Sequence, residues 1–477
     1  MPALRRRRAL KSAVAVLALV ALVTAVWGIK QWAPFADDES STIYWPRSIK
    51  PLADFVEDTT GLQFDQSVEV QFAGTDEEYA AIADPPRPQP TADELEIDAA
   101  QEAAGRAFGL WNGEMSSADA DAAIYANIGV ASWDPFSNVL VVRADDPEDL
   151  SPRVRSSVVR ELTFALDAQR FDYVSRVDDL RTRQEYLALI ALDVGHALWV
   201  HDRYFSDELT LDEQEDYGGE IVAGNEDYTD TTDWIPPAYA ALRTIAQQLG
   251  IVFVDVLSDD PAALHRALGD ELPQALDQIT LPVGHYQRLD RTEAVEAPPV
   301  PRGGERLYTN QAGPFLLHLM LSTGSPANTA LTAADGWGGD AYTVYRLNDR
   351  VCLDMHMVAD SRADADRLDI ALNNWAAVRP AASSALVGRD GVDLYVSVCD
   401  PGTAEEQPVP TQDDVDQYVR RSNLLRHEMT ITGDLEAAEC TAVAVFADAL
   451  VADFDDPNFD IVGVITAAEA DCGIAQG

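Results

Sequence analysis

The clearest hydrophobic pattern in the sequence lies in residues 151–172, where apolar side chains recur at helical spacing. The recurring positions are Val154, Val158, Leu162 and Leu166. Pro152 suits the first turn of a helix, and Ser151 before it is a typical N-cap. The pattern therefore predicts a helix that begins at Pro152 and carries one apolar face.

Patterns in the rest of the chain predict a mixture of strands and helices. Strands are expected at residues 68–72, 128–133, 138–142, 342–346, 351–357 and 392–398. Helices are expected at residues 94–110, 184–204, 237–256, 261–268, 313–322 and 362–375, and over most of 413–477. The helix at 184–204 is apolar nearly all round, so we expect it to be buried. Residues 207–233 are acidic and predict an irregular loop.

The N-terminus has the charge pattern of a membrane anchor. Basic side chains at residues 1–11 precede an uncharged apolar run at residues 12–28. Because the positive flank stays in the cytoplasm, this order predicts a single span with a cytoplasmic tail and an extracytoplasmic remainder. A signal peptide is the alternative, since Val23-Thr24-Ala25 resembles a cleavage site. Either way the functional part is extracytoplasmic, with a linker at residues 29–50 before the folded part.

The composition is that of an acidic, folded protein. The 477 residues include 81 acidic and 34 basic side chains, which gives a formal net charge of −47. Such a surface repels nucleic acid, so we expect no nucleic-acid partner. Hydrophobic residues make up 47% of the chain, which excludes wholesale disorder and allows a sizeable core.

Four cysteines lie in the C-terminal third of the chain, and none belongs to a Cys-x-x-Cys motif. Neighbourhood in the sequence favours pairing of Cys352 with Cys399 and of Cys440 with Cys472, although four cysteines allow three connectivities. If these pairs are disulfides, the compartment is oxidising.

The predicted helix at residues 151–172 also contains a pentapeptide with a known chemical counterpart. Residues 160–164 read Arg-Glu-Leu-Thr-Phe, where a zinc protease has His-Glu-x-x-His on one helix. In such an enzyme the two histidines bind zinc and the glutamate acts as general base. Glu161 stands at the position of that glutamate, whereas Arg160 and Phe164 replace the histidines.

Together with its surroundings, this segment resembles a group of bacterial membrane-anchored zincin-type metallopeptidases. Residues 160–172, RELTFALDAQRFD, are similar to the metal-binding helix of that group, HELTHALQDQHFD. Further similar segments, in the same order along the chain, are residues 61–70, 133–143, 191–197, 272–286 and 333–345. The resemblance implies an α+β fold with a zincin-like domain at residues 51–402. We expect a helical C-terminal extension at residues 403–477.

The resemblance also implies which positions would bind the metal, and all three have changed. The histidine positions hold Arg160 and Phe164, and the glutamate expected as third ligand falls on Val194. Zinc requires three protein ligands and an open position for water, and an arginine repels a dication. We therefore expect no zinc or other cofactor and no zinc-dependent proteolysis, with Glu161 as a relic of the general base.

Two hypotheses concern the place of the metal. In the first, Arg160 replaces the metal charge and pairs with Glu161 or Asp193, while Phe164 fills the remaining space. In the second, Glu161, Asp193 and His196 form a displaced metal site of a hydrolase. The spacing of His196 and His201, five residues apart, is poor for one helix face.

The function expected from these residues is non-catalytic. A groove related to a peptidase substrate site can still bind an extended peptide or a protein segment. We therefore expect a membrane-anchored, extracytoplasmic pseudopeptidase with a peptide or protein partner or a regulatory role. The alternatives are the displaced-metal hydrolase and a structural protein of the cell envelope.

Overall fold

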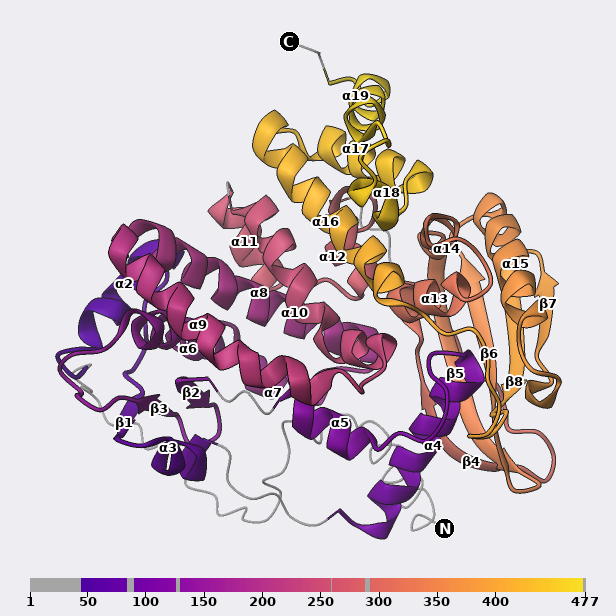
Figure 1. The fold of residues 1–477 in the computed structure, drawn as a ribbon, viewed down its shortest axis with the longest axis horizontal. Coiled ribbons are helices and arrows are strands. Elements are labelled where there is room, and N and C mark those ends of the chain that lie inside the picture. Colours follow the sequence, from indigo (N-terminus) through magenta and orange to yellow (C-terminus); the bar gives the residue numbers. More distant parts are fainter. Residues whose placement is uncertain (1–43, 84–89, 126–128, 259, 288–291, 475–477) are drawn as a thin grey trace.

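The computed structural model describes residues 44–83, 90–125, 129–258, 260–287 and 292–474. Two β-sheets and a layer of long helices give an α+β protein, as the sequence predicts (Figure 1). The expected anchor or signal peptide at residues 12–28 lies outside the described residues.

The first sheet has three strands in the order β1-β3-β2. Its strands are β1 (Glu69–Ala73), β2 (Ala131–Asp134) and β3 (Val139–Arg143). β3 pairs in parallel with β1 and antiparallel with β2. Because successive side chains of a strand point to opposite faces, Leu140 and Val142 face the main core. Val141 points the other way and packs with Tyr79 of α3 (Asp76–Ala83).

Three long helices form a layer against this sheet. They are α6 (Pro152–Phe171), α8 (Arg183–Asp207) and α10 (Pro237–Leu257). α6 contacts the small sheet and α8, and α8 packs along α10. At the crossing of α8 and α10, a Cβ at Gly250 would lie 1.7 Å from the carbonyl oxygen of Ala191, and a Cβ at Gly195 would meet the Gly250 backbone at 2.3 Å. Only glycine allows the two backbones to approach so closely.

Among the described residues, α10 is the one helix that is long and apolar enough to cross a membrane. It contacts α8 and α16 (Gln412–Thr432), and 56% of its most apolar stretch is buried. A helix buried in the core of a folded domain can be equally long and apolar. The apolar surface of α10 is thus used in packing.

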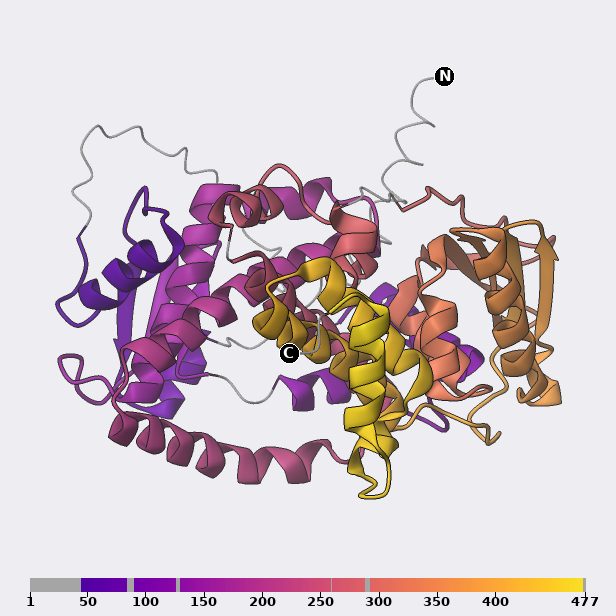
Figure 2. The same ribbon diagram turned by 90° about the horizontal axis from the view of Figure 1, so that it is seen from above.

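The predicted loop at residues 207–233 is wrong. Most of this segment forms α9 (Leu211–Thr232), which lies along the outside of the helical layer (Figure 2). Its first turn has a capping box, in which Thr210 Oγ1 accepts from the N–H of Glu213 and Glu213 Oε2 accepts from the N–H of Thr210. An ion pair between Glu213 and Arg155 joins the helix to α6. Capping and this contact stabilise a helix of which no described side chain is fully buried.

The second sheet has five antiparallel strands in the order β4-β5-β6-β8-β7. Its strands are β4 (Glu305–Asn310), β5 (Trp337–Leu347), β6 (Arg350–Ala359), β7 (Leu386–Asp390) and β8 (Asp393–Cys399). The predicted hairpin turn joins β5 to β6, where Asn348 and Asp349 have φ of 50° and 60°. These left-handed values are the ones that a two-residue hairpin turn of this kind requires.

Helices surround the second sheet. α13 and α15 contact it, α14 packs on both of them, and α4 contacts β4, β6 and β8. The bounds of these helices are α4 (Ala92–Phe108), α13 (Gly313–Ser322), α14 (Ala327–Ala334) and α15 (Arg362–Ala377). Shorter helices elsewhere are α2 (Lys50–Thr60), α5 (Ser117–Ile124), α7 (Tyr173–Asp179), α11 (Pro261–Leu268) and α12 (Leu276–Thr280).

The C-terminal part is helical, as expected, and packs on the rest of the protein. After α16 come α17 (Leu435–Asp448), α18 (Val451–Asp455) and α19 (Ile461–Asp471). α16 contacts α10, α13 and α14, and its residues Val415 and Tyr418 belong to the main hydrophobic core. A disulfide joins Cys440 of α17 to Cys472 at the end of α19.

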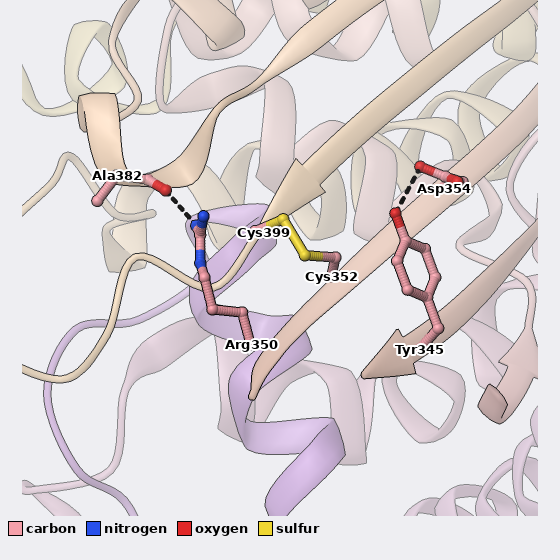
Figure 3. Close-up of a disulfide and its surroundings, with 6 residues drawn as sticks. All are labelled: Tyr345, Arg350, Cys352, Asp354, Ala382 and Cys399. Atoms are coloured by element: carbon pink, nitrogen blue, oxygen red, sulfur yellow. Dashed lines mark hydrogen bonds between the residues drawn. A yellow bond between two sulfur atoms is a disulfide. The ribbon is translucent and has the colours of Figure 1, made fainter. Parts of the chain in front are cut away.

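The other disulfide joins two neighbouring strands of the second sheet. Cys352 on β6 and Cys399 at the end of β8 are directly opposed in the strand pairing, and Figure 3 shows the bond between them. Both pairs favoured by neighbourhood in the sequence therefore occur in the structure. No free cysteine is present in the described part of the chain, which contains all four.

Candidate functional site

The residues of the candidate site lie on the packed helices α6 and α8. α6 begins as predicted, with the Ser151 side chain accepting a hydrogen bond from the N–H of Val154. The helix turns Glu161 toward the small sheet, where the residue is 7% exposed. The other residues of the candidate site, Arg160, Phe164, Asp193 and Val194, are partly buried.

Both carboxylate oxygens of Glu161 are engaged. Oε1 accepts from Nε and Nη2 of Arg160 at 3.0 and 2.8 Å. Oε2 accepts from the main-chain N–H of Trp133 on β2 at 3.0 Å. A general base needs a lone pair directed at the water whose proton it takes. In this arrangement Glu161 serves instead as the counter-ion of Arg160 and as the acceptor for an edge-strand amide.

The three expected metal positions do not fit zinc. A guanidinium, a phenyl ring and an isopropyl group, from Arg160, Phe164 and Val194, stand where the resemblance places the ligands. None of these groups is a zinc ligand, and the Arg160 cation is paired with the Glu161 carboxylate, where it would repel a metal ion. The sequence analysis considered Glu161 and Asp193 as partners of Arg160, and Glu161 is the one that Arg160 contacts.

A second polar pair lies between the same helices. Nδ1 of His196 on α8 lies 2.8 Å from Oδ2 of Asp167 on α6, and both residues are 0% exposed. His196 Nε2 and Asp167 Oδ1 are also buried and have no hydrogen-bond partner. Burial raises the pKa of Asp167, and His196 partly opposes that effect. His196 is therefore held by one carboxylate inside the α6–α8 interface.

Asp193 on α8 is a further carboxyl group near this pair, partly buried as a residue but with a buried Oδ1. Burial raises its pKa well above the usual value, and the carboxylates of Asp167 and Glu161 add to the effect. Its Oδ1 has no hydrogen-bond partner. Asp193 therefore keeps its proton to a higher pH than an ordinary aspartate, and it does not pair with Arg160.

The displaced metal site has no geometric counterpart in the structure. Within the described residues, no group of three His, Cys, Asp or Glu side chains is placed to hold a metal ion. Glu161 is bonded to Arg160 and Trp133, whereas His196 is bonded to Asp167. His201 lies elsewhere on α8, where it contacts Asp202 and Tyr217. The structure thus does not bring these side chains together as ligands.

Sequence reasoning missed three residues that complete the site. Trp133 was assigned only to a strand, and its amide contact depends on how the small sheet packs on α6. Asp167 follows Phe164 by three positions on α6, so its place on the buried face could have been found from helical spacing. Tyr79 on α3 lies near the Arg160–Glu161 pair. The pKa of its hydroxyl is raised, mainly by burial and to a smaller extent by the negative charge of Glu161.

The glycine-rich element of the resemblance, within residues 333–345, has a structural role. Asp340 on β5 is fully buried and accepts from the N–H groups of Ala312 and Gly313 at 2.8 and 2.9 Å. It also accepts from the indole N–H of Trp337 at 2.9 Å. The carboxylate thereby caps the start of α13, and this segment belongs to the packing of the second sheet.

Comparison with known proteins gives one match. A protein-family profile described as a domain of unknown function, DUF8575, matches residues 301–407. This range contains the second sheet with α13, α14 and α15, and it does not contain α4, α6 or α8. No curated protein and no solved structure matches the chain. The chain is thus similar to this uncharacterised domain over part of its length.

Proposed function

We propose that this protein is a membrane-anchored, extracytoplasmic pseudopeptidase of the zincin type, which binds a peptide or protein segment without cleaving it. The observation that carries the proposal is the engagement of both Glu161 oxygens by Arg160 and Trp133. A carboxylate that already accepts three hydrogen bonds and is neutralised by a guanidinium is a weakened base toward a nucleophilic water. The similarity of residues 160–172 to a peptidase helix supports the proposal that the site derives from a peptidase active site.

The partner is proposed to bind along the free edge of β2. This strand lies at the edge of the small sheet, next to α6. Since the N–H of Trp133 bonds to Glu161, it points away from β3 and toward the side where another strand would add. An extended peptide binds such an edge through main-chain hydrogen bonds. Glu161 would compete with the peptide for this amide and so weaken or regulate its binding.

The location follows from the N-terminal charge pattern. Residues 1–11 would remain in the cytoplasm, residues 12–28 would span the membrane, and the folded part would face outward. The two disulfides are stable in an oxidising compartment, which supports this placement. The net charge of −47 would keep the folded part away from anionic lipid and from nucleic acid.

A displayed random-peptide library, selected on the immobilised protein, tests the proposal. Selected peptides should remain intact by mass spectrometry after incubation with the protein. They should also bind about fivefold more tightly to the double variant Arg160→Met with Glu161→Ala, because it frees the Trp133 amide without leaving an unpaired charge. The variant Arg170→Met, on the exposed end of α6, should bind like the natural protein. Cleavage of the peptides, or failure to select any, would contradict the proposal.

A further inference from the structure

A small cavity lies between the helical layer and the second sheet. Its volume is about 70 Å³, and it is bordered by α4, α10, β4, β5 and the first residue of α8. Much of its wall is aromatic or aliphatic, from Phe108, Leu110, Trp111, Tyr239, Leu242 and Leu316. None of the residues of the candidate site lines this cavity.

Two guanidinium groups line the cavity, and only one of them has a partner. Arg243 is paired with Asp121 at 2.9 Å and donates to the hydroxyl of Tyr239 at 2.8 Å. Arg183 has no hydrogen bond or ion pair with any residue that the structure describes, although it is only partly exposed. Burial lowers the pKa of Arg183, and the charge of Arg243 adds to that effect. A desolvated cation of this kind normally has an anionic partner.

The carboxylates around the cavity already have donors and do not serve as that partner. Oε1 of Glu102 accepts from the N–H and the hydroxyl of Ser117 at 2.9 and 3.0 Å. Asp121 is bound to Arg243, and Asp340 accepts three N–H groups of its own surroundings. Among the described residues none of these carboxylates pairs with Arg183, which leaves its guanidinium open to an anionic ligand.

Tyr342 offers a second donor in the same cavity. Tyr342 lines the cavity together with Tyr308, Asn310 and Arg183. Burial raises the pKa of Tyr342 to about 12, so its hydroxyl keeps its proton at neutral pH and can donate a hydrogen bond. A ligand that accepts from both Arg183 and Tyr342 would satisfy the polar groups of the cavity.

We infer that this cavity binds a small monocarboxylate. The carboxylate would accept from the Arg183 guanidinium, whose fork matches two oxygens, and from the Tyr342 hydroxyl. The volume has room for about five water-sized groups, so the hydrocarbon part is a few carbons long and contacts the aromatic wall. A dianion such as phosphate is disfavoured, because the carboxylate of Glu102 lines the cavity and that of Asp121 is bound to the lining residue Arg243. This site is independent of the proposed peptide groove.

Titration calorimetry on the full-length protein with butyrate, butyramide and inorganic phosphate tests the inference. Butyrate should bind saturably, and butyramide and phosphate should bind at least about tenfold more weakly. Arg183→Gln should weaken butyrate binding at least about tenfold, and Tyr342→Phe should weaken it by a smaller factor. The exposed Arg302, which does not line the cavity, provides the control variant Arg302→Gln.

The Arg183→Gln variant is expected to fold, because it removes a partly buried charge that has no partner among the described residues. Its thermal midpoint without ligand should equal or exceed that of the natural protein. Butyrate binding that is unchanged in this variant would overturn the inference, as would the absence of saturable butyrate binding to the natural protein. Tighter binding of phosphate than of butyrate would overturn the assignment to a monocarboxylate.

Discussion

The main-chain N–H of Trp133 donates a hydrogen bond to Oε2 of Glu161 across 3.0 Å. The bond joins the edge strand β2 to α6, at the residue that a zinc peptidase would use as general base. Arg160 occupies the other oxygen of the same carboxylate. These three hydrogen bonds and the neighbouring cation weaken Glu161 as a base toward water.

Replacing Arg160 by methionine should lower the free energy of unfolding by about 1–2 kcal/mol. The change leaves the Glu161 carboxylate buried without its counter-ion. The expected loss of stability is modest, because the Arg160 side chain is 33% exposed and water screens its charge. Urea denaturation measures the effect. The matched control is Arg170→Met on the same helix, whose ion pair with Asp65 is more exposed and should cost less than about 0.5 kcal/mol. Equal stability of the natural protein and the Arg160 variant would show that the pair is not a structural contact.

Asp193→Asn should stabilise the protein, and more so at high pH. The raised pKa of Asp193 means that the folded state holds a proton which the unfolded chain releases above about pH 4, so stability falls as the pH rises. Asparagine removes this titration, and we expect a gain in stability at pH 8 and a smaller gain at pH 4. Exposed Asp202 on the same helix gives the control Asp202→Asn. A loss of stability at pH 8 would indicate that Asp193 is ionised and paired.

His318 should make the protein sensitive to mild acid. It is fully buried on α13, with Nε2 2.7 Å from the main-chain oxygen of Asp414, and burial lowers its pKa from 6.5 to about 4. The unfolded chain binds a proton below about pH 6.5 and the folded protein does not, so stability is lost as the pH falls through this window. The loss at pH 5 is about 2 kcal/mol.

The variant His318→Gln tests this assignment. Glutamine can keep a hydrogen bond to Asp414 but does not titrate, so stability should change less between pH 7 and pH 5 than in the natural protein. The same change at His427, which is exposed, should leave the pH dependence as it is. Parallel pH profiles of the His318 variant and the natural protein would contradict the assignment.

Loss of the Cys440–Cys472 disulfide should release α19. Only Ala468 of this helix is fully buried, so the covalent bond holds a segment with little packing of its own. Closing this loop of 32 residues corresponds to ~3–4 kcal/mol of restriction in the unfolded chain. Limited proteolysis of the double variant Cys440→Ala with Cys472→Ala should cut after α17 while the rest of the chain resists.

The other disulfide provides the comparison. Cys352 and Cys399 lie on paired strands, whose ladder of hydrogen bonds holds them together without the covalent bond. The double variant Cys352→Ala with Cys399→Ala should therefore show no new cleavage site near residues 352–399. Equal protease resistance of α19 in both double variants would contradict the role assigned to Cys440–Cys472.

Local signals in the sequence predicted the parts of the fold that depend on local chemistry. The helix at α6 was found from its cap and apolar spacing, and the β5–β6 hairpin from its Asn348-Asp349 turn. α9 was missed because its acidic sequence carries little apolar pattern, although the Thr210 and Glu213 capping box marks its start.

The site could be predicted only as far as the residues of α6 and α8. Arg160 and Glu161 are neighbours in the sequence, so their pairing was within reach. The bond to Trp133 and the pairing of His196 with Asp167 depend on how separate elements pack. The same holds for the cavity at Arg183, whose wall comes from residues more than a hundred positions apart. Periodicity along one segment carries no information on such contacts.

Zinc content and casein hydrolysis, measured on the natural protein beside the triple variant Arg160→His, Phe164→His and Val194→Glu, test the central claim most directly. We predict that the natural protein contains no zinc and is inactive, whereas the triple variant takes up about one zinc per chain. The second result would show that α6 and α8 retain the geometry of a zincin site from which the ligands have been lost. Stoichiometric zinc in the natural protein, or its hydrolysis of casein, would contradict the account, and His196 would then be the first residue to replace.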